Sequence, residues 1–102
     1  QRLNFISTEF KNNPLVLVEK YDGLTAEFCK TKNIKHIVRG LRNPADFEFE
    51  KKIALFNKSL EEIETIFFLT SPNNAFISSS MVREIIVNGG NYKKFVPESV
   101  SA

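Results

Sequence analysis

Two segments of this 102-residue chain hold side chains suited to binding phosphate. The first is Val38-Arg39-Gly40-Leu41-Arg42, in which two arginines flank a Gly-Leu pair. A guanidinium group donates two parallel hydrogen bonds to a phosphate, and glycine lets the backbone turn tightly or approach a ligand closely. The segment therefore predicts an anion site. Two solvated arginines paired with carboxylates such as Asp46 or Glu48 would give the same pattern, and the residues alone leave both interpretations open.

The second segment is Phe76-Ile77-Ser78-Ser79-Ser80-Met81-Val82-Arg83. Its three serines predict the start of a helix, because they supply caps, hydroxyls and free backbone amides. Arg83, one turn inside, could reach an anion bound at that helix end. Ordinary capping by serine explains the pattern equally well, so this signal alone is weak.

Glu50 lies on the helix expected after the first segment. It follows Phe47 by three residues and precedes Ala54 by four, on a side that points partly inward. An inward carboxylate needs a partner, which an arginine or a ligand hydroxyl would provide. The alternative is a boundary glutamate whose carboxylate reaches water.

The remaining reactive residue types receive structural interpretations. The single histidine, His36, has no serine, cysteine or carboxylate motif around it and is expected on the surface. The single cysteine, Cys29, cannot form an internal disulfide and is expected to fill the core. No cluster has metal-ligand spacing. We therefore assign neither a metal ligand nor a catalytic residue within this chain.

Alternating helices and strands must position these segments. We expect helices over residues 3–10, 24–32 (capped by Asp22, with Leu24 and Phe28 inside), 44–60 (capped by Asn43) and 78–87 (ended by Gly89-Gly90), and strands over 15–18, 34–38 and 65–69. This order predicts an α/β fold, a single domain over residues 1–102 whose parallel sheet has crossover helices. Such sheets bind ligands beyond the carboxyl ends of their strands, where both segments lie.

Bulk composition narrows the class of protein. Hydrophobic residues make up 42% and charged residues 25%, which is ordinary for a globular domain, and ten phenylalanines predict a Phe-rich core. A net charge of +2 predicts neither a nucleic-acid groove nor a membrane-binding face. The apolar runs are too short to span a bilayer, and no signal peptide is evident. We expect a cytoplasmic protein.

Several motifs together resemble the phosphopantetheine adenylyltransferase family. The arginine segment at 38–42 is followed by Ala45-Asp46-Phe47-Glu48-Phe49-Glu50, and the serine segment by Glu84, Gly89-Gly90 and Phe95-Val96-Pro97. The order and spacing fit from Arg2 to about Val100. The arginine segment with its acidic helix is the specific part, whereas the serine segment recurs in related nucleotidyltransferases.

The resemblance implies a Rossmann-like fold and transfer of AMP from ATP to 4′-phosphopantetheine in coenzyme A biosynthesis. It implies that Arg39 and Thr25 bind phosphopantetheine. It implies an ATP site made of Gly40, Leu41, Arg42, Glu50 (at the ribose or adenosine), Asn74, Ala75, Phe76, Ile77, Ser78, Ser79, Ser80 and Arg83. It also implies Mg²⁺, a homohexamer and coenzyme A as a further ligand.

One departure from the family is large. The family's first strand and loop carry a His-x-Gly-His type motif, and this chain contains none. The chain opens with Gln1-Arg2 and apolar residues at helical spacing, so we expect it to be the C-terminal part of a longer enzyme, without the first strand-helix unit and inactive alone. Two alternatives stay open: a non-catalytic nucleotide-binding or oligomerisation fragment, and a related nucleotidyltransferase that uses another acceptor, such as nicotinamide mononucleotide or a glycerol phosphate.

Overall fold

The computed structural model describes residues 1–101 and contains two compact units. The sheet unit, Tyr21–Phe76, holds α2 (Thr25–Thr31), β1 (His36–Leu41), α3 (Pro44–Glu61) and β2 (Glu64–Leu69). The terminal unit consists of Gln1–Lys20 and the segment from Ile77 onward. It holds α1 (Arg2–Glu9), α4 (Ser79–Val87) and the 3₁₀ turn η1 (Lys93–Phe95).

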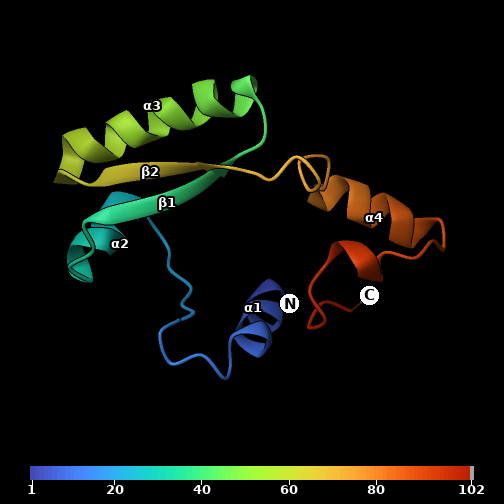
Figure 1. Cartoon of the computed structure of the whole chain (residues 1–102). Coiled ribbons are helices and arrows are strands. Elements are labelled where there is room, and N and C mark those ends of the chain that lie inside the picture. Colours follow the sequence, from blue (N-terminus) through green and yellow to red (C-terminus); the bar gives the residue numbers. More distant parts are fainter. Residues whose placement is uncertain (102) are drawn as a thin grey trace. The chain divides into compact units, whose positions relative to one another are not determined.

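The sheet unit is built on a parallel strand pair with a crossover helix (Figure 1). β1 and β2 pair from His36 opposite Glu64 to Leu41 opposite Leu69, and α3 connects them. Parallel strands need such a crossover, because a tight turn would make them antiparallel. The expected α/β class with a parallel sheet is confirmed.

Local chemistry fixes the start of α3. The Asn43 side chain accepts a hydrogen bond from the Asp46 backbone N–H at 2.9 Å, and Pro44 occupies the first helical position. Both features suit a helix start, since proline has no N–H to satisfy and asparagine satisfies one of the free donors. The helix ends at Glu61, and the C-cap residue Glu62 has a φ of 56°, in the left-handed region. The cap holds α3 directly after the arginine segment.

Loss of this cap should be measurable. We expect Asn43→Ala to lower the free energy of unfolding by about 1 kcal/mol, because the Asp46 N–H loses its acceptor. Asn43→Ser restores an acceptor and should recover most of that loss. Urea unfolding followed by circular dichroism measures both variants. Equal stability of the alanine variant and the unaltered protein would show that the cap contributes nothing.

The core of the sheet unit is small and aliphatic. Ala26, Cys29 and Ile63 are buried together, with Ile37 packed against them. The expectation for Cys29 is therefore confirmed. The expected Phe-rich core is wrong, since no phenylalanine within residues 1–101 is fully buried and Phe49 and Phe68 are 66% and 60% exposed. A two-stranded layer with its helices encloses small side chains but cannot surround aromatic rings.

The expected strand at residues 15–18 is wrong. This stretch has no regular structure, and Leu15 and Leu17 are 92% and 81% exposed. Asn13 diverts the backbone, because its side chain accepts from the Leu15 N–H at 3.0 Å and its carbonyl accepts from the Val16 N–H at 3.2 Å. Donors that are engaged in a turn are not available to a strand ladder.

The expected boundaries of α2 and β1 need correction. α2 begins at Thr25 after Leu24, which has no side-chain cap bond, so Asp22 does not cap the helix. Leu24 is 47% exposed, and Ala26 and Cys29 form the inner side instead. β1 covers 36–41 and not 34–38, so Gly40 and Leu41 belong to the strand, because β2 offers them pairing partners in Phe68 and Leu69.

The helices of the terminal unit agree with the sequence patterns. α1 covers Arg2–Glu9, close to the expected 3–10, and α4 covers Ser79–Val87 with Ser78 as its N-cap. After α4, Gly89 has φ of +73° and the Gly90 N–H donates to the Ile85 carbonyl at 2.8 Å, which confirms the glycine C-cap. Within residues 1–101, none of the helices combines the length and the hydropathy that a membrane span requires.

Candidate functional site

The sequence-predicted site residues fall in both units. Thr25, Glu50, the arginine segment and residues 74–76 belong to the sheet unit, whereas residues 77–80 and Arg83 belong to the terminal unit. Within the sheet unit, three of them line one cavity of about 330 Å³, which we call the polar cavity. These three are Thr25, Arg39 and Glu50. The other residues that line it are Tyr21, Ile37, Val38, Ile53, Ala54, Asn57 and Thr65.

The centre of the polar cavity is a two-point ion pair between Arg39 and Glu50. Arg39 Nε donates to Glu50 Oε2 at 3.0 Å, and Arg39 Nη2 donates to Oε1 at 2.6 Å. The expectation that Glu50 points inward and needs a partner is confirmed, since its side chain is only 12% exposed. The hydrogen bond to Glu50 raises the pKa of Arg39, so the guanidinium stays charged throughout the physiological range.

Sheet register explains how this pair forms. Arg39 lies opposite Phe67 on the adjacent strand, so the two side chains share one face of the sheet. Phe67 meets Phe47 edge to face, with ring centroids 5.7 Å apart and planes at 76°. Glu50 follows Phe47 by three residues and therefore lies on the same side of α3. The aromatic contact thus places the Glu50 side of the helix over Arg39.

One wall of the polar cavity comes from the start of α2. The hydroxyls of Tyr21 and Thr25 share a hydrogen bond of 2.6 Å, and the Tyr21 ring stacks on Phe28 at 4.4 Å between centroids. Stacking holds the ring, and the hydrogen bond fixes the position of its hydroxyl. Thr25 thus lies in the cavity with Arg39.

Two further polar residues of the cavity escaped the sequence analysis. Asn57 is 5% exposed, and the buried Thr65 Oγ1 has no hydrogen-bond partner among the described residues. Asn57 follows Glu50 by seven residues, about two helical turns, and this spacing was the signal that could have identified it. Tyr21 and Thr65 carry no comparable signal, because their positions depend on how distant segments pack.

Gly40, Leu41 and Arg42 of the arginine segment lie outside the polar cavity. Gly40 is a strand residue, and an added Cβ would meet only Thr70 Oγ1, at 4.0 Å, so the backbone here does not require glycine. Leu41 is 7% exposed and its carbonyl accepts from the Thr70 N–H at 2.8 Å. Arg42 lies 3.5 Å from Asp46, and its backbone N–H donates to the same carboxylate at 2.9 Å. The carboxylate pairing considered from the sequence therefore holds for Arg42.

Residues 74–76 follow β2. The Asn74 N–H donates to the Ser71 carbonyl at 2.9 Å and closes a turn, while Phe76 is 60% exposed. Asn74, Ala75 and Phe76 do not line the polar cavity. They continue from the carboxyl end of β2, the kind of position where parallel sheets bind ligands.

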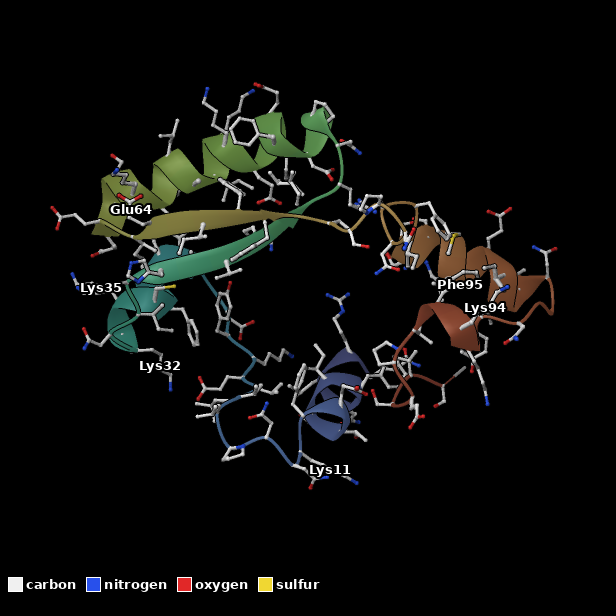
Figure 2. The ribbon with its side chains drawn as sticks, in the orientation of Figure 1. Lys11, Lys32, Lys35, Glu64, Lys94 and Phe95 are labelled. Atoms are coloured by element: carbon white, nitrogen blue, oxygen red, sulfur yellow. The ribbon has the colours of Figure 1, made fainter. Side chains whose placement is uncertain are left out.

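The serine segment borders a second cavity, of about 660 Å³, within the terminal unit. Ser78 Oγ accepts from the Met81 N–H at 3.2 Å, which is ordinary N-capping, and Arg83 Nη2 donates to Ser80 Oγ at 3.4 Å. Ile77, Ser78, Ser79 and Arg83 line this cavity, as does Phe95. Lys94 lies over the Phe95 ring with Nζ 5.1 Å from its centroid (Figure 2).

The amino ends of the strands carry a separate group of charged residues. Lys35 and Glu64 lie there (Figure 2), and the Glu64 N–H donates to the Lys35 carbonyl at 3.1 Å. Lys58 pairs with Glu64 at 2.7 Å, and Lys30 with Glu61 at 3.5 Å. None of these charged residues lines the polar cavity. They provide matched controls for the pair between Arg39 and Glu50.

Comparison with known proteins covers almost the whole chain. A family model described as cytidylyltransferase-like matches residues 1–85. A phosphopantetheine adenylyltransferase of Flavobacterium psychrophilum is 56% identical over 99 residues, which is 97% of this chain and 66% of that protein. The enzyme of the same name from Flavobacterium johnsoniae is 50% identical, over 98% of this chain and 66% of its own length.

More distant relatives carry the same name. The phosphopantetheine adenylyltransferase of Lachnoclostridium phytofermentans is 45% identical over 98% of this chain and 62% of its own length. The chain thus spans between 62% and 66% of the length of these three curated relatives.

Proposed function

This chain belongs to the cytidylyltransferase-like family, and from that premise we propose that it forms the C-terminal part of a pantetheine-phosphate adenylyltransferase of coenzyme A biosynthesis. The observation that carries the proposal is the position of Arg39 in the polar cavity beside Thr25. A charged, half-exposed guanidinium suits a phosphate, and the hydroxyls near it suit an uncharged polar arm. The names of the relatives support the same substrate.

The proposed reaction needs no covalent enzyme intermediate. An oxygen of the 4′-phosphate attacks the α-phosphorus of ATP, the new O–P bond forms, and the bond to the β-phosphate breaks. Pyrophosphate leaves with that electron pair, and dephospho-coenzyme A is the other product. Catalysis then consists of aligning two anionic substrates and stabilising the negative charge on the oxygens around the transferred phosphorus. Arg39 would hold the acceptor phosphate for this attack.

We propose, from the resemblance, which residues of each unit contact ATP. The amides at the start of α4, with Ser79 and Ser80, would lie nearest the phosphates, because a helix N-terminus favours anions. Arg83 lies one turn further along that helix. Ile77 and Ser78 of the same unit would also contact ATP. In the sheet unit, considered by itself, the resemblance implies Gly40, Leu41, Arg42, Asn74, Ala75 and Phe76 as ATP contacts.

Magnesium would reach the enzyme with ATP. Within residues 1–101, no group of three or more His, Cys, Asp or Glu side chains could hold a metal ion, so the described residues do not fit a protein-built magnesium site. Mg²⁺ is commonly held by substrate phosphates and one or two carboxylates. No step of the proposed mechanism passes through the metal. We further propose, from the family resemblance, a cytoplasmic homohexamer that also binds coenzyme A.

Pyrophosphate release tests the proposed function. The full-length protein is this chain with the part that corresponds to the remainder of its relatives. It should release pyrophosphate from ATP only when 4′-phosphopantetheine is added. Nicotinamide mononucleotide and glycerol phosphate, offered as competing acceptors, should give little or none. Turnover with either of them would assign the chain to a related nucleotidyltransferase. Binding of ATP or coenzyme A in calorimetry without any turnover would favour a non-catalytic nucleotide-binding protein.

A further inference from the structure

We propose that Glu50 is a positioning residue that fixes the Arg39 guanidinium for the phosphate of the acceptor, and that it does not act mainly on the nucleotide. The inference rests on the proposed function, because it concerns how the acceptor phosphate is held. The family resemblance alone assigns Glu50 to the ribose or adenosine of ATP. The geometry of the polar cavity favours a different role.

Burial separates the parts played by the two partners. The Glu50 side chain is 12% exposed, whereas that of Arg39 is 53% exposed. A ligand that enters from solvent therefore meets the guanidinium before it meets the carboxylate. Both Glu50 oxygens already accept hydrogen bonds from Arg39. The enclosed carboxylate thus acts on Arg39, and the exposed guanidinium is the group that can reach an anion.

The two-point contact fixes orientation as well as distance. An arginine held at Nε and at one terminal nitrogen cannot rotate its planar group independently of the carboxylate. Its other N–H donors remain for a phosphate. β1 carries Arg39 and α3 carries Glu50. The contact between Phe47 and Phe67 ties α3 to β2, which pairs with β1. Glu50 thus holds the donors of Arg39 in one plane before a ligand arrives.

The test compares two ligands that differ only in the phosphate. In the full-length protein, the dissociation constants of 4′-phosphopantetheine and of unphosphorylated pantetheine give a ratio that reports the phosphate contact. The ratio is insensitive to a fraction of unfolded protein, because both ligands are measured on the same sample. We expect Glu50→Gln to reduce the ratio about tenfold or more, since misplacement of a binding group by about 1 Å has large effects. The dissociation constant of ATP should change by less than about threefold.

A double-mutant cycle decides whether Glu50 acts through Arg39. If it does, the variant with both Arg39→Ala and Glu50→Gln should have the same ratio as Arg39→Ala alone. Glu50→Asp keeps the charge but shortens the side chain, and it should reduce the ratio in the same direction. Glu61→Gln is the matched control, because Glu61 also lies on α3 and pairs with a lysine at 3.5 Å. It should leave the ratio unchanged.

The outcomes separate the inference from the proposed function. An unchanged ratio in Glu50→Gln, or a loss confined to ATP affinity, would overturn the positioning role while leaving the adenylyltransferase intact. A further loss in the double variant beyond Arg39→Ala would overturn it as well, because Glu50 would then contact the ligand independently. Equal affinity of the unaltered protein for both ligands would rule out 4′-phosphopantetheine as the proposed substrate, and the inference would fail with it.

Discussion

Replacement of Arg39 by alanine is expected to lower kcat/KM for 4′-phosphopantetheine by about 30- to 800-fold, measured as pyrophosphate release by the full-length protein. The range corresponds to roughly 2–4 kcal/mol for the loss of a charge-assisted contact in the transition state. The guanidinium is the exposed member of its ion pair and lies in the polar cavity, so it is the group best placed to meet an anion. Its removal also leaves the enclosed Glu50 carboxylate without its partner, which adds repulsion toward a phosphate.

Two variants calibrate that loss. Arg39→Lys keeps the charge but not the planar fork, so its activity should lie between those of the unaltered protein and the alanine variant. Lys58→Ala removes an equal charge from an exposed ion pair with Glu64, the first residue of β2, and exposed pairs contribute little. Its kcat/KM should stay within about twofold of the unaltered protein. Near-normal pyrophosphate release by Arg39→Ala would mean that the ion pair with Glu50 is only structural.

The starts of α3 and α4 were predictable because local chemistry decides them. Asn43 and Ser78 cap α3 and α4 with their own side chains, and glycine follows the end of α4. Such signals act over three or four residues and do not depend on the rest of the fold. The inward direction of Glu50 was predictable for a similar reason, since helical periodicity alone places it on the inner side.

The absence of a strand near residue 15 and the residue at which β1 ends were not predictable, because pairing between distant segments decides where strands form. Leu15 to Val18 has an apolar composition that suits a buried strand, yet no neighbour pairs with it in the described structure. Gly40 reads as a loop residue from its type, yet Phe68 opposite extends the strand through it. Composition describes what a segment tolerates, whereas strand existence and length depend on a partner elsewhere in the chain.

The polar cavity shows the same division. Arg39 and Glu50 were both identified from the sequence, but the direct bond between them was not, because it depends on the register of β1 with β2 and on the contact between Phe47 and Phe67. Thr65 was unremarkable in the sequence, and its significance comes only from burial without a partner. The residue types that bind ligands can therefore be read from the chain, while their grouping requires the packed structure.

The core that supports this grouping should be sensitive at Ile63, the residue between the left-handed Glu62 and the first residue of β2. Ile63 is 1% exposed and is buried with Ala26 and Cys29. Small neighbours on packed helices cannot move far enough to fill a cavity, so Ile63→Ala is expected to lower the free energy of unfolding by about 2–5 kcal/mol. Ile63→Val removes one methyl group and should cost roughly 1 kcal/mol.

Urea unfolding of the full-length protein, at the same protein concentration for every variant, measures the free energy of unfolding of both Ile63 variants and of a control variant on α3. Leu55 is 57% exposed. Leu55→Ala removes more carbon atoms than Ile63→Val, but it removes them from a side chain that is already largely exposed to solvent. It should cost about 1 kcal/mol or less. If Ile63→Ala were no more harmful than Leu55→Ala, the small core would have to rearrange around the lost side chain. The fixed position of α2 against Ile37 of β1 could then not be attributed to close packing at Ile63.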